Sequence, residues 1–333
     1  QYKHDPGNKN SLSDDIVLSM LVDKNGYYWI GTKSGGLNKF DYSKKIFTHY
    51  LENPLSPNGL LSNSIQSLLE DKSGNIWIGT YSSGLNILNP ETGVFARYTN
   101  ISSDPNSLSD DRIYSLVEDK KGNIWIGTYG GGLNKFDRLT GKFFRYQFNE
   151  NDSTSISSNA TWSLALDDDG NLWIGTFGGG VNVLNLQNQT FTYFKNDPED
   201  STSIADNNII RIFKDSKGNV WVGTTKGLCR YLEETKSFKN YNEENGLANN
   251  FVYGILEGIN GNLWISTNNG LSKFNPGKET FKSYYAQDGL QGNEFNQNAF
   301  AKDNKSGRLL FGGPNGFNVF NPDKVRGNTY VST

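Results

Sequence analysis

The chain has 333 residues, of which 35% are hydrophobic and 13% aromatic, and it contains 37 glycines. Its formal net charge is −3 and its lysines and arginines are scattered, so it lacks the basic stripe that a nucleic-acid partner requires. No apolar run approaches the length of a membrane span, and the single cysteine, Cys229, excludes an intrachain disulfide. The composition indicates many short strands joined by tight turns, with neither nucleic-acid binding nor direct membrane insertion expected.

One short motif recurs along the whole sequence. Its clearest copy, Gly-Asn-Ile-Trp-Ile-Gly-Thr, occupies residues 122–128, and the last copy, at residues 307–313, has lost both the tryptophan and the threonine. Successive tryptophans are 48 residues apart four times, and the two remaining intervals are 43 and 46 residues. The seven central positions are Trp29, Trp77, Trp125, Trp173, Trp221, Trp264 and Leu310. A period of this length predicts seven copies of one structural unit.

The third unit illustrates the strands that we expect in each repeat. Residues 112–119 alternate apolar with mixed side chains, as a half-buried strand does, and the nearly continuous apolar character of residues 123–128 predicts a strand buried on both faces. Glycine-containing turns lead to a third strand at residues 133–137 and a fourth at residues 142–148. Each unit is therefore expected to form a small antiparallel sheet.

Four short strands cannot bury both faces of such a sheet alone, so neighbouring units must pack face to face. Radial packing around an axis solves this problem and leaves only short edges exposed. The repeated tryptophans would then lie between neighbouring sheets. The sequence predicts an all-β fold, a seven-bladed β-propeller with four antiparallel strands per blade.

The two ends of the chain are expected to close the ring. The seventh unit stops after its third strand, at residues 320–322, and Tyr2 aligns with Tyr98 of a fourth strand when the repeats are superimposed. The N-terminal strand is therefore expected to complete the last blade and to cover its exposed edge. On this interpretation residues 1–325 form a single propeller cut from a longer polypeptide. Residues 326–333 are then a tail that leads to a missing downstream domain.

The repeat has three signatures: Ser-Leu-Ser-x-Asn/Asp-x-Ile, Glu-Asp-x-x-Gly-x-Ile-Trp-Ile-Gly-Thr and Gly-Gly-Leu-Asn-x-Phe-Asp. Together they resemble the regulator-propeller repeat of two-component systems, and the resemblance extends over essentially the whole chain. It implies the periplasmic sensor region of a Bacteroidetes-type hybrid system whose histidine kinase lies elsewhere in the protein. It also implies a glycan or oligosaccharide ligand and neighbouring propeller and β-sandwich domains in the same chain. A homodimer is the partner expected if the propeller serves as an interface instead.

Candidate ligand-binding residues are those that differ between repeats on the face where loops converge. In the first four units the loop after the second strand begins with Lys33, Tyr81, Tyr129 and Phe177. Aromatic faces bind the apolar C–H surfaces of sugars, so rings in three consecutive units suggest a carbohydrate platform. The alternative is that these rings only shield the glycine-rich turns beneath them.

A second candidate set lies where the innermost strands begin, around the mouth of the central channel. Trp162 is the only tryptophan outside the repeated motif, so packing between blades does not require it. The residues expected to line the channel are Arg112, Tyr114, Trp162, Asn208, Arg211 and Tyr253. Such side chains can instead fill the channel as a plug, and the sequence leaves both interpretations open.

A ring of carboxylate and amide side chains precedes these strands. Its members are Asp15, Asn63, Asp111, Asn159, Asn207, Asn250 and Asn296. Recurrence in every unit indicates that each accepts hydrogen bonds from local backbone N–H groups rather than binding a metal. We therefore expect no metal site and no cofactor.

Catalytic residues are not expected either. The two histidines, His4 and His49, fall on outer strands, and Cys229 has no neighbouring histidine that could activate a thiol. The sequence thus favours a non-catalytic sensor domain. A scaffold or dimerisation propeller without its own small ligand is the second hypothesis, and a propeller lyase is the third.

Overall fold

A computed structural model of the chain describes residues 1–53, 55–56 and 58–325. The strands of these residues form six four-stranded antiparallel sheets and one three-stranded sheet. In chain order they are β1 Val17–Val22, β2 Tyr28–Thr32, β3 Leu37–Asp41, β4 Ile46–Tyr50, β5 Ile65–Glu70, β6 Ile76–Thr80, β7 Leu85–Leu88, β8 Phe95–Tyr98, β9 Ile113–Glu118, β10 Ile124–Thr128, β11 Leu133–Asp137, β12 Lys142–Tyr146, β13 Thr161–Leu166, β14 Asn171–Thr176, β15 Gly180–Asn185, β16 Phe191–Phe194, β17 Ile209–Lys214, β18 Val220–Thr224, β19 Gly227–Leu232, β20 Ser237–Tyr241, β21 Val252–Glu257, β22 Leu263–Thr267, β23 Gly270–Asn275, β24 Thr280–Tyr284, β25 Phe300–Lys302, β26 Leu309–Gly313 and β27 Gly316–Phe320. Two 3-10 helices occur, at Glu243–Asn245 and Ala286–Asp288. Within the described ranges no helix has the length and apolar character to cross a membrane.

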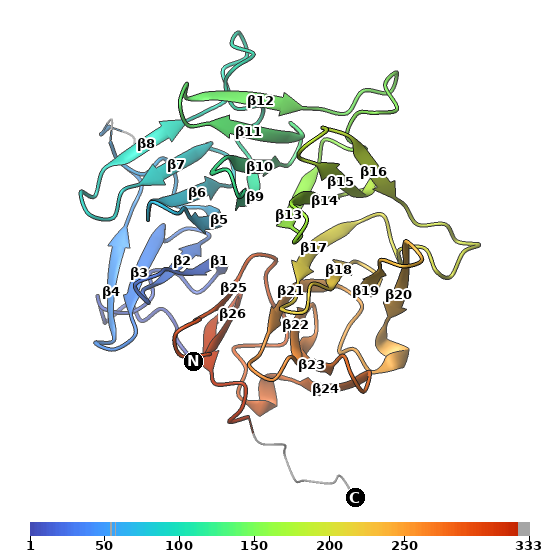
Figure 1. Cartoon of the computed structure of the whole chain (residues 1–333). Helices are drawn as coiled ribbons and strands as arrows, with labels where there is room; N and C mark the ends of the chain where they lie inside the picture. The colour runs from blue at the N-terminus through green and yellow to red at the C-terminus, as the bar shows by residue number, and fades with distance from the viewer. Residues whose placement is uncertain (54, 57, 326–333) are drawn as a thin grey trace, which may run out of the picture.

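The sheets follow one another around a central axis (Figure 1). The innermost strands β1, β5, β9, β13, β17, β21 and β25 contact each other in this order, and β25 contacts β1. This ring of seven blades confirms the predicted fold. In the third blade the strands begin and end within two residues of the predicted positions. The predicted C-terminal tail, residues 326–333, lies outside the described residues.

The repeated tryptophans lie between neighbouring blades, as predicted. Trp125 on β10 is 1% exposed and packs in one cluster with Leu164, Ile174 and Leu184 of the fourth blade. Its Nε1 donates a hydrogen bond of 3.0 Å to the carboxylate of Asp119. The same tryptophan–aspartate bond recurs in blades one, two, four and five. In the six blades that have the tryptophan, its indole packs against the next blade, and in five of them the indole N–H also holds the turn that contains the aspartate.

The ring of carboxylate and amide side chains has its predicted structural role in six blades. Asp111, for example, accepts a hydrogen bond of 2.6 Å from the backbone N–H of Asn100. In the seventh blade the prediction of Asn296 is wrong, because Asn293 accepts the corresponding bond from Ala286 at 2.7 Å. The physical reason is that the seventh blade inserts residues between this amide and β25, which shifts the alignment of the repeats.

The N-terminal segment forms one β-bridge with the seventh blade. Tyr2 and Phe317 of β27 exchange two backbone hydrogen bonds, of 2.8 and 3.0 Å, as a single antiparallel bridge. Their rings stack with centroids 5.0 Å apart. Within the described residues the pairing does not extend to a full fourth strand, so closure of the ring by the N-terminal strand stays a prediction.

Removal of residues 1–4 is expected to lower the free energy of unfolding by about 2–4 kcal/mol. The reason is that the Tyr2 ring also packs against Phe40 and Phe47 of the first blade, so its loss opens the boundary between the first and last blades. Scanning calorimetry of the truncated and full chains measures the difference. A truncated chain that melts at the temperature of the full chain would show that this segment has no part in closure.

Gly132, in the loop between β10 and β11, has no room for a side chain. Its φ is +79°, and an added Cβ would lie 2.3 Å from the carbonyl oxygen of Tyr146. We expect Gly132→Ala to destabilise the fold by more than about 2 kcal/mol, because backbone strain adds to a steric clash. Gly141 is the matched control, since its φ of +68° carries the same strain but its surroundings are open. Urea unfolding of the two variants should give the larger loss for Gly132→Ala, and equal losses would contradict the steric argument.

Candidate functional site

Four aromatic side chains of two neighbouring blades stack at one mouth of the channel. Tyr114 on β9 and Tyr129 in the β10–β11 loop belong to the third blade, whereas Trp162 on β13 and Phe177 in the β14–β15 loop belong to the fourth. The Trp162 ring is central, with centroids 5.4 Å from Tyr114, 6.2 Å from Tyr129 and 4.4 Å from Phe177. All three pairs are stacked, with interplanar angles between 22° and 27°. We refer to these four residues as the aromatic cluster.

Polar groups lie along the edge of the aromatic cluster. The guanidinium of Arg112 lies 4.7 Å from the centroid of the Tyr129 ring and donates to the Asp110 carboxylate at 2.5 Å. This hydrogen bond raises the pKa of Arg112. Burial, followed by the nearby hydroxyls of Tyr81 and Tyr129, raises the pKa of Tyr114 to about 12. At neutral pH the edge therefore carries a charged pair and a neutral phenol.

The outer rings of the cluster face solvent. Tyr129 is 42% exposed, Phe177 is 41% exposed and the neighbouring Tyr81 is 52% exposed, whereas Tyr114 is buried. Large exposed rings beside hydrogen-bonding groups offer an apolar face together with polar anchors. This combination is suited to a ligand that has both kinds of surface, as a sugar ring does.

The remaining predicted site residues lie apart from the aromatic cluster. Lys33 is exposed on the first blade, and Asn208 pairs at 3.4 Å with an aspartate of its own blade. The Tyr253 ring packs on Phe251 with centroids 4.7 Å apart. Arg211 lines a cavity within the channel. The structure thus gathers predicted residues of blades three and four in the cluster, with Tyr81 of blade two beside it, and leaves those of blades one, five and six outside.

Two residues that the sequence analysis did not select cross the channel beside the cluster. Gln297 Nε2 donates to the carbonyls of Trp162 at 3.4 Å and Ile210 at 3.1 Å. Asn298 Nδ2 donates to the carbonyl of Tyr114 at 2.8 Å and to a carbonyl of β5 at 3.0 Å. We call Gln297 and Asn298 the channel crossing. The seventh blade therefore supplies side chains that span the channel, and the only signal for this in the sequence was the degenerate seventh repeat.

The histidines and the cysteine are held in structural contacts. His49 lies on the outermost strand β4 and bonds the carbonyl of Ser11 at 2.9 Å, and His4 bonds that of Leu12 at 2.7 Å. Burial raises the pKa of the Cys229 thiol to about 12, so the thiol is protonated at neutral pH. Within the part of the chain that the structure describes, no group of three or more histidine, cysteine, aspartate or glutamate side chains is arranged to hold a metal ion.

Six segments of the chain match the family model described as two component regulator propeller. The matched residues are 11–34, 59–82, 107–130, 155–178, 203–226 and 246–269. Each segment runs from the approach to a first strand to the loop after the second strand. The chain is therefore a propeller built from two component regulator propeller repeats. None of the curated proteins compared with the chain matches it.

Solved structures place these repeats in a larger context. The extracellular domain of a hybrid two component system from B. thetaiotaomicron is 32% identical to this chain, with a TM-score of 0.81. That match covers 95% of this chain and 40% of the other. The extracellular domain of another hybrid two component system from B. thetaiotaomicron is 22% identical, with a TM-score of 0.52, and the match covers 99% of this chain and 48% of that one. The chain thus has the repeats and the fold found in the extracellular region of such systems, and it spans less than half the length of these relatives.

An enzyme shares the fold as well. A catalytically inactive variant of virginiamycin B lyase from Staphylococcus aureus, solved with quinupristin, is 15% identical, with a TM-score of 0.69. The match covers 93% of this chain and 96% of the lyase. At this level of identity the likeness concerns the seven-bladed architecture alone, because function resides in the site rather than in the fold.

Proposed function

We propose that this chain is a non-catalytic sensor domain of a hybrid two-component system, and that it recognises a glycan or oligosaccharide at the aromatic cluster. The observation that carries the proposal is the stack of Tyr114, Tyr129, Trp162 and Phe177, whose outer rings are exposed beside the Arg112–Asp110 pair. Trp162 is not part of the repeated motif, so its presence is not explained by packing between blades. The likeness to the extracellular domain of a hybrid two component system supports a sensor rather than an enzyme.

The setting of the domain is part of the same proposal. Residues 1–325 act as one propeller, located in the periplasm, between a neighbouring propeller and a β-sandwich of the same chain. A signal from the bound glycan passes through these domains toward a histidine kinase in the cytoplasm. The partial coverage of the related extracellular domains is consistent with such neighbours.

A thermal-shift screen tests this function. The chain is titrated with xylan, arabinan, pectin and dextran and with oligosaccharides released from each of them. A ligand present at 100 times its dissociation constant stabilises the folded state by about 2.7 kcal/mol, which raises the melting temperature visibly. A response that Tyr129→Ala removes, without a change in the melting temperature of the free protein, would support the proposal. A melting temperature that none of the polysaccharides or oligosaccharides in a broad panel raises would contradict the proposal.

A scaffold function is the second candidate, and one surface favours it. Beside the outermost strand β12 the third blade exposes Leu139 at 96%, Phe144 at 51% and Phe148 at 49%. Exposed apolar side chains distributed along an outer edge strand can form an interaction surface, which would suit a homodimer. Analytical ultracentrifugation tests this candidate: a dimer that dissociates in Phe144→Ser would support it, and a monomer at every concentration would exclude it.

A further inference from the structure

Arg211 occupies a position that carries a small hydroxyl side chain in four other blades. The residues paired with the motif glycines in this register are Ser19, Ser67, Ser115 and Ser163, and in the fifth blade Arg211 pairs with Gly223. The serine is short enough to bond within the blade boundary, as when Ser19 Oγ donates to the carbonyl of Ile65 at 2.9 Å. A guanidinium is too long for that role, so the fold of the repeat does not explain this arginine.

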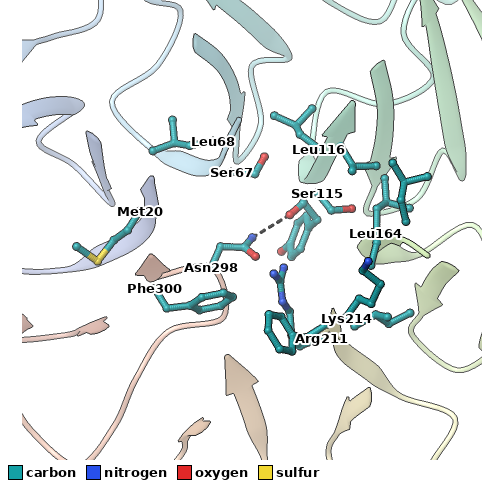
Figure 2. Close-up of a pocket in the computed structure, with 16 residues that line it drawn as sticks. Met20, Ser67, Leu68, Ser115, Leu116, Leu164, Arg211, Lys214, Asn298 and Phe300 are labelled. Atoms are coloured by element: carbon teal, nitrogen blue, oxygen red, sulfur yellow. Dashed lines mark hydrogen bonds between the residues drawn. The ribbon is translucent and has the colours of Figure 1, made fainter. Parts of the chain in front are cut away.

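The Arg211 side chain instead enters a cavity within the channel (Figure 2). The cavity has a volume of about 370 Å³, more than ten times the ~30 Å³ that one water molecule occupies in the liquid. The guanidinium lies 4.7 Å from the centroid of the Phe300 ring, and Asn298 of the channel crossing lies on the wall of the same cavity. Ser115 also lies on this wall, but its hydroxyl is buried against Gly127 at the blade boundary.

This cation has no counterion in the described part of the chain. The Nε atom of Arg211 is buried without a hydrogen-bond partner, and so is the Oγ atom of Ser115. The ion pairs found among the described residues do not include Arg211. The other cation of the cavity, Lys214, is paired with Asp168. Desolvation lowers the pKa of Arg211 to about 10, so it remains charged at neutral pH.

Arg211 is half-buried without a counterion, and a charge that is partly removed from water is costly unless an opposite charge reaches it. Stacking on Phe300 offsets only part of that cost. We propose that the cavity is a binding site for a small carboxylate anion, which Arg211 holds through its guanidinium. The planar fork of a guanidinium matches the two oxygens of a carboxylate, and the edge formed by the two terminal nitrogens of Arg211 can make such a bidentate contact from the cavity wall.

This anion site shares Tyr114 with the aromatic cluster but none of its other three residues. The innermost strands line the channel. The side-chain amides of the channel crossing donate hydrogen bonds to the backbone carbonyls of Tyr114, Trp162 and Ile210 on these strands. The ring contacts of the cluster involve Tyr114, Trp162 and the loops after β10 and β14, which carry Tyr129 and Phe177. The cavity is lined mainly by residues that follow these three positions along their strands, including Ser115 and Arg211. A carboxylate in the cavity therefore lies on the other side of the crossing from a ligand on the rings.

Two substitutions of Arg211 and two carboxylates test the site. Sodium acetate and sodium glucuronate are titrated against the whole chain in a thermal-shift assay, at an ionic strength held constant with sodium chloride. Arg211→Ser restores the side chain that blades one to four carry, so it is expected to fold, and Arg211→Lys keeps the charge but loses the planar fork. Tyr129→Ala is the control that separates this site from the proposed glycan site.

For the parent chain we expect the melting temperature to rise by roughly 2–5 °C near saturation, and for Arg211→Ser we expect no rise. Arg211→Lys should bind the carboxylate with an apparent affinity at least tenfold weaker than that of the parent. The response should persist in Tyr129→Ala. Equal responses to acetate and glucuronate would assign the site to a free carboxylate, and a response to glucuronate alone would assign it to an acidic sugar. Failure of the parent to respond to either salt, or an undiminished response in Arg211→Ser, would overturn the site and leave the glycan proposal untouched.

Discussion

Trp162→Ala is expected to weaken binding of the oligosaccharide ligand by roughly thirtyfold or more while the propeller stays folded. The Trp162 ring is the central member of the aromatic cluster, and it contacts the rings of Tyr114, Tyr129 and Phe177. Its loss removes a stacking surface and also frees the neighbouring rings to move. Central aromatic residues of a binding site commonly contribute about 2 kcal/mol or more, which corresponds to a factor of about thirty in the dissociation constant.

The chain offers a matched control for this variant. Tyr253 occupies the same register position on β21 as Trp162 on β13, since each precedes the residue paired with the sixth position of the motif. It lies outside the aromatic cluster and packs on Phe251. Calorimetric titration should give a parental dissociation constant for Tyr253→Ala and a much weaker one for Trp162→Ala. Similar losses in both variants would mean that the ligand occupies the whole mouth of the channel rather than the cluster.

Trp125→Ala is expected to lower the free energy of unfolding by about 3–5 kcal/mol, the usual cost of deleting a large buried ring. The indole is 1% exposed and fills the boundary between the third and fourth blades. Its removal also takes a hydrogen-bond donor from the buried carboxylate of Asp119. Burial alone would raise the pKa of Asp119, but the hydrogen bonds from Asn123 and Trp125 lower it. Urea unfolding followed by circular dichroism measures the loss.

Leu139→Ala is the control for the stability measurement, because Leu139 is 96% exposed and its truncation should change stability by less than about 0.5 kcal/mol. A loss below about 1 kcal/mol in Trp125→Ala would contradict the view that the repeated tryptophans hold the blades together. Such a result would shift the main stabilising role to the aliphatic residues of each boundary.

The fold was accessible from the sequence because each blade repeats the same local information. Apolar alternation, a glycine turn and a tryptophan recur with a nearly constant period, and the strands of the third blade were placed within two residues. The seventh blade was less predictable. It lacks the tryptophan, and Asn293 lies seven residues before Phe300, whereas the corresponding Asn250 lies five residues before Ile255. This insertion of two residues, with one further residue in the β25–β26 turn, moved the predicted amide by three positions to Asn296 and hid the channel crossing.

The candidate site was only partly accessible for a related reason. Trp162 stood out because the motif does not require it, and its ring meets Tyr129 and Phe177 because equivalent positions on adjacent blades lie at the same level of the channel. The position of Arg211 in the cavity, apart from the aromatic cluster, could not be predicted from the spacing of the repeats. It depends on how the side chains of Gln297 and Asn298 cross the channel, and no repeat determines the conformation of that segment.

The most direct test of ligand stacking on Trp162 is a tryptophan fluorescence titration of the parent chain and Trp162→Phe with an oligosaccharide that raises the melting temperature. The other six tryptophans are buried in the repeated motif, so only Trp162 should report a ligand on the rings. In the parent chain we expect a saturable change of tryptophan emission, and in Trp162→Phe we expect none. Trp162→Phe should still show the thermal shift, because it keeps an aromatic ring at this position. An identical change of emission in both proteins would contradict binding at the aromatic cluster.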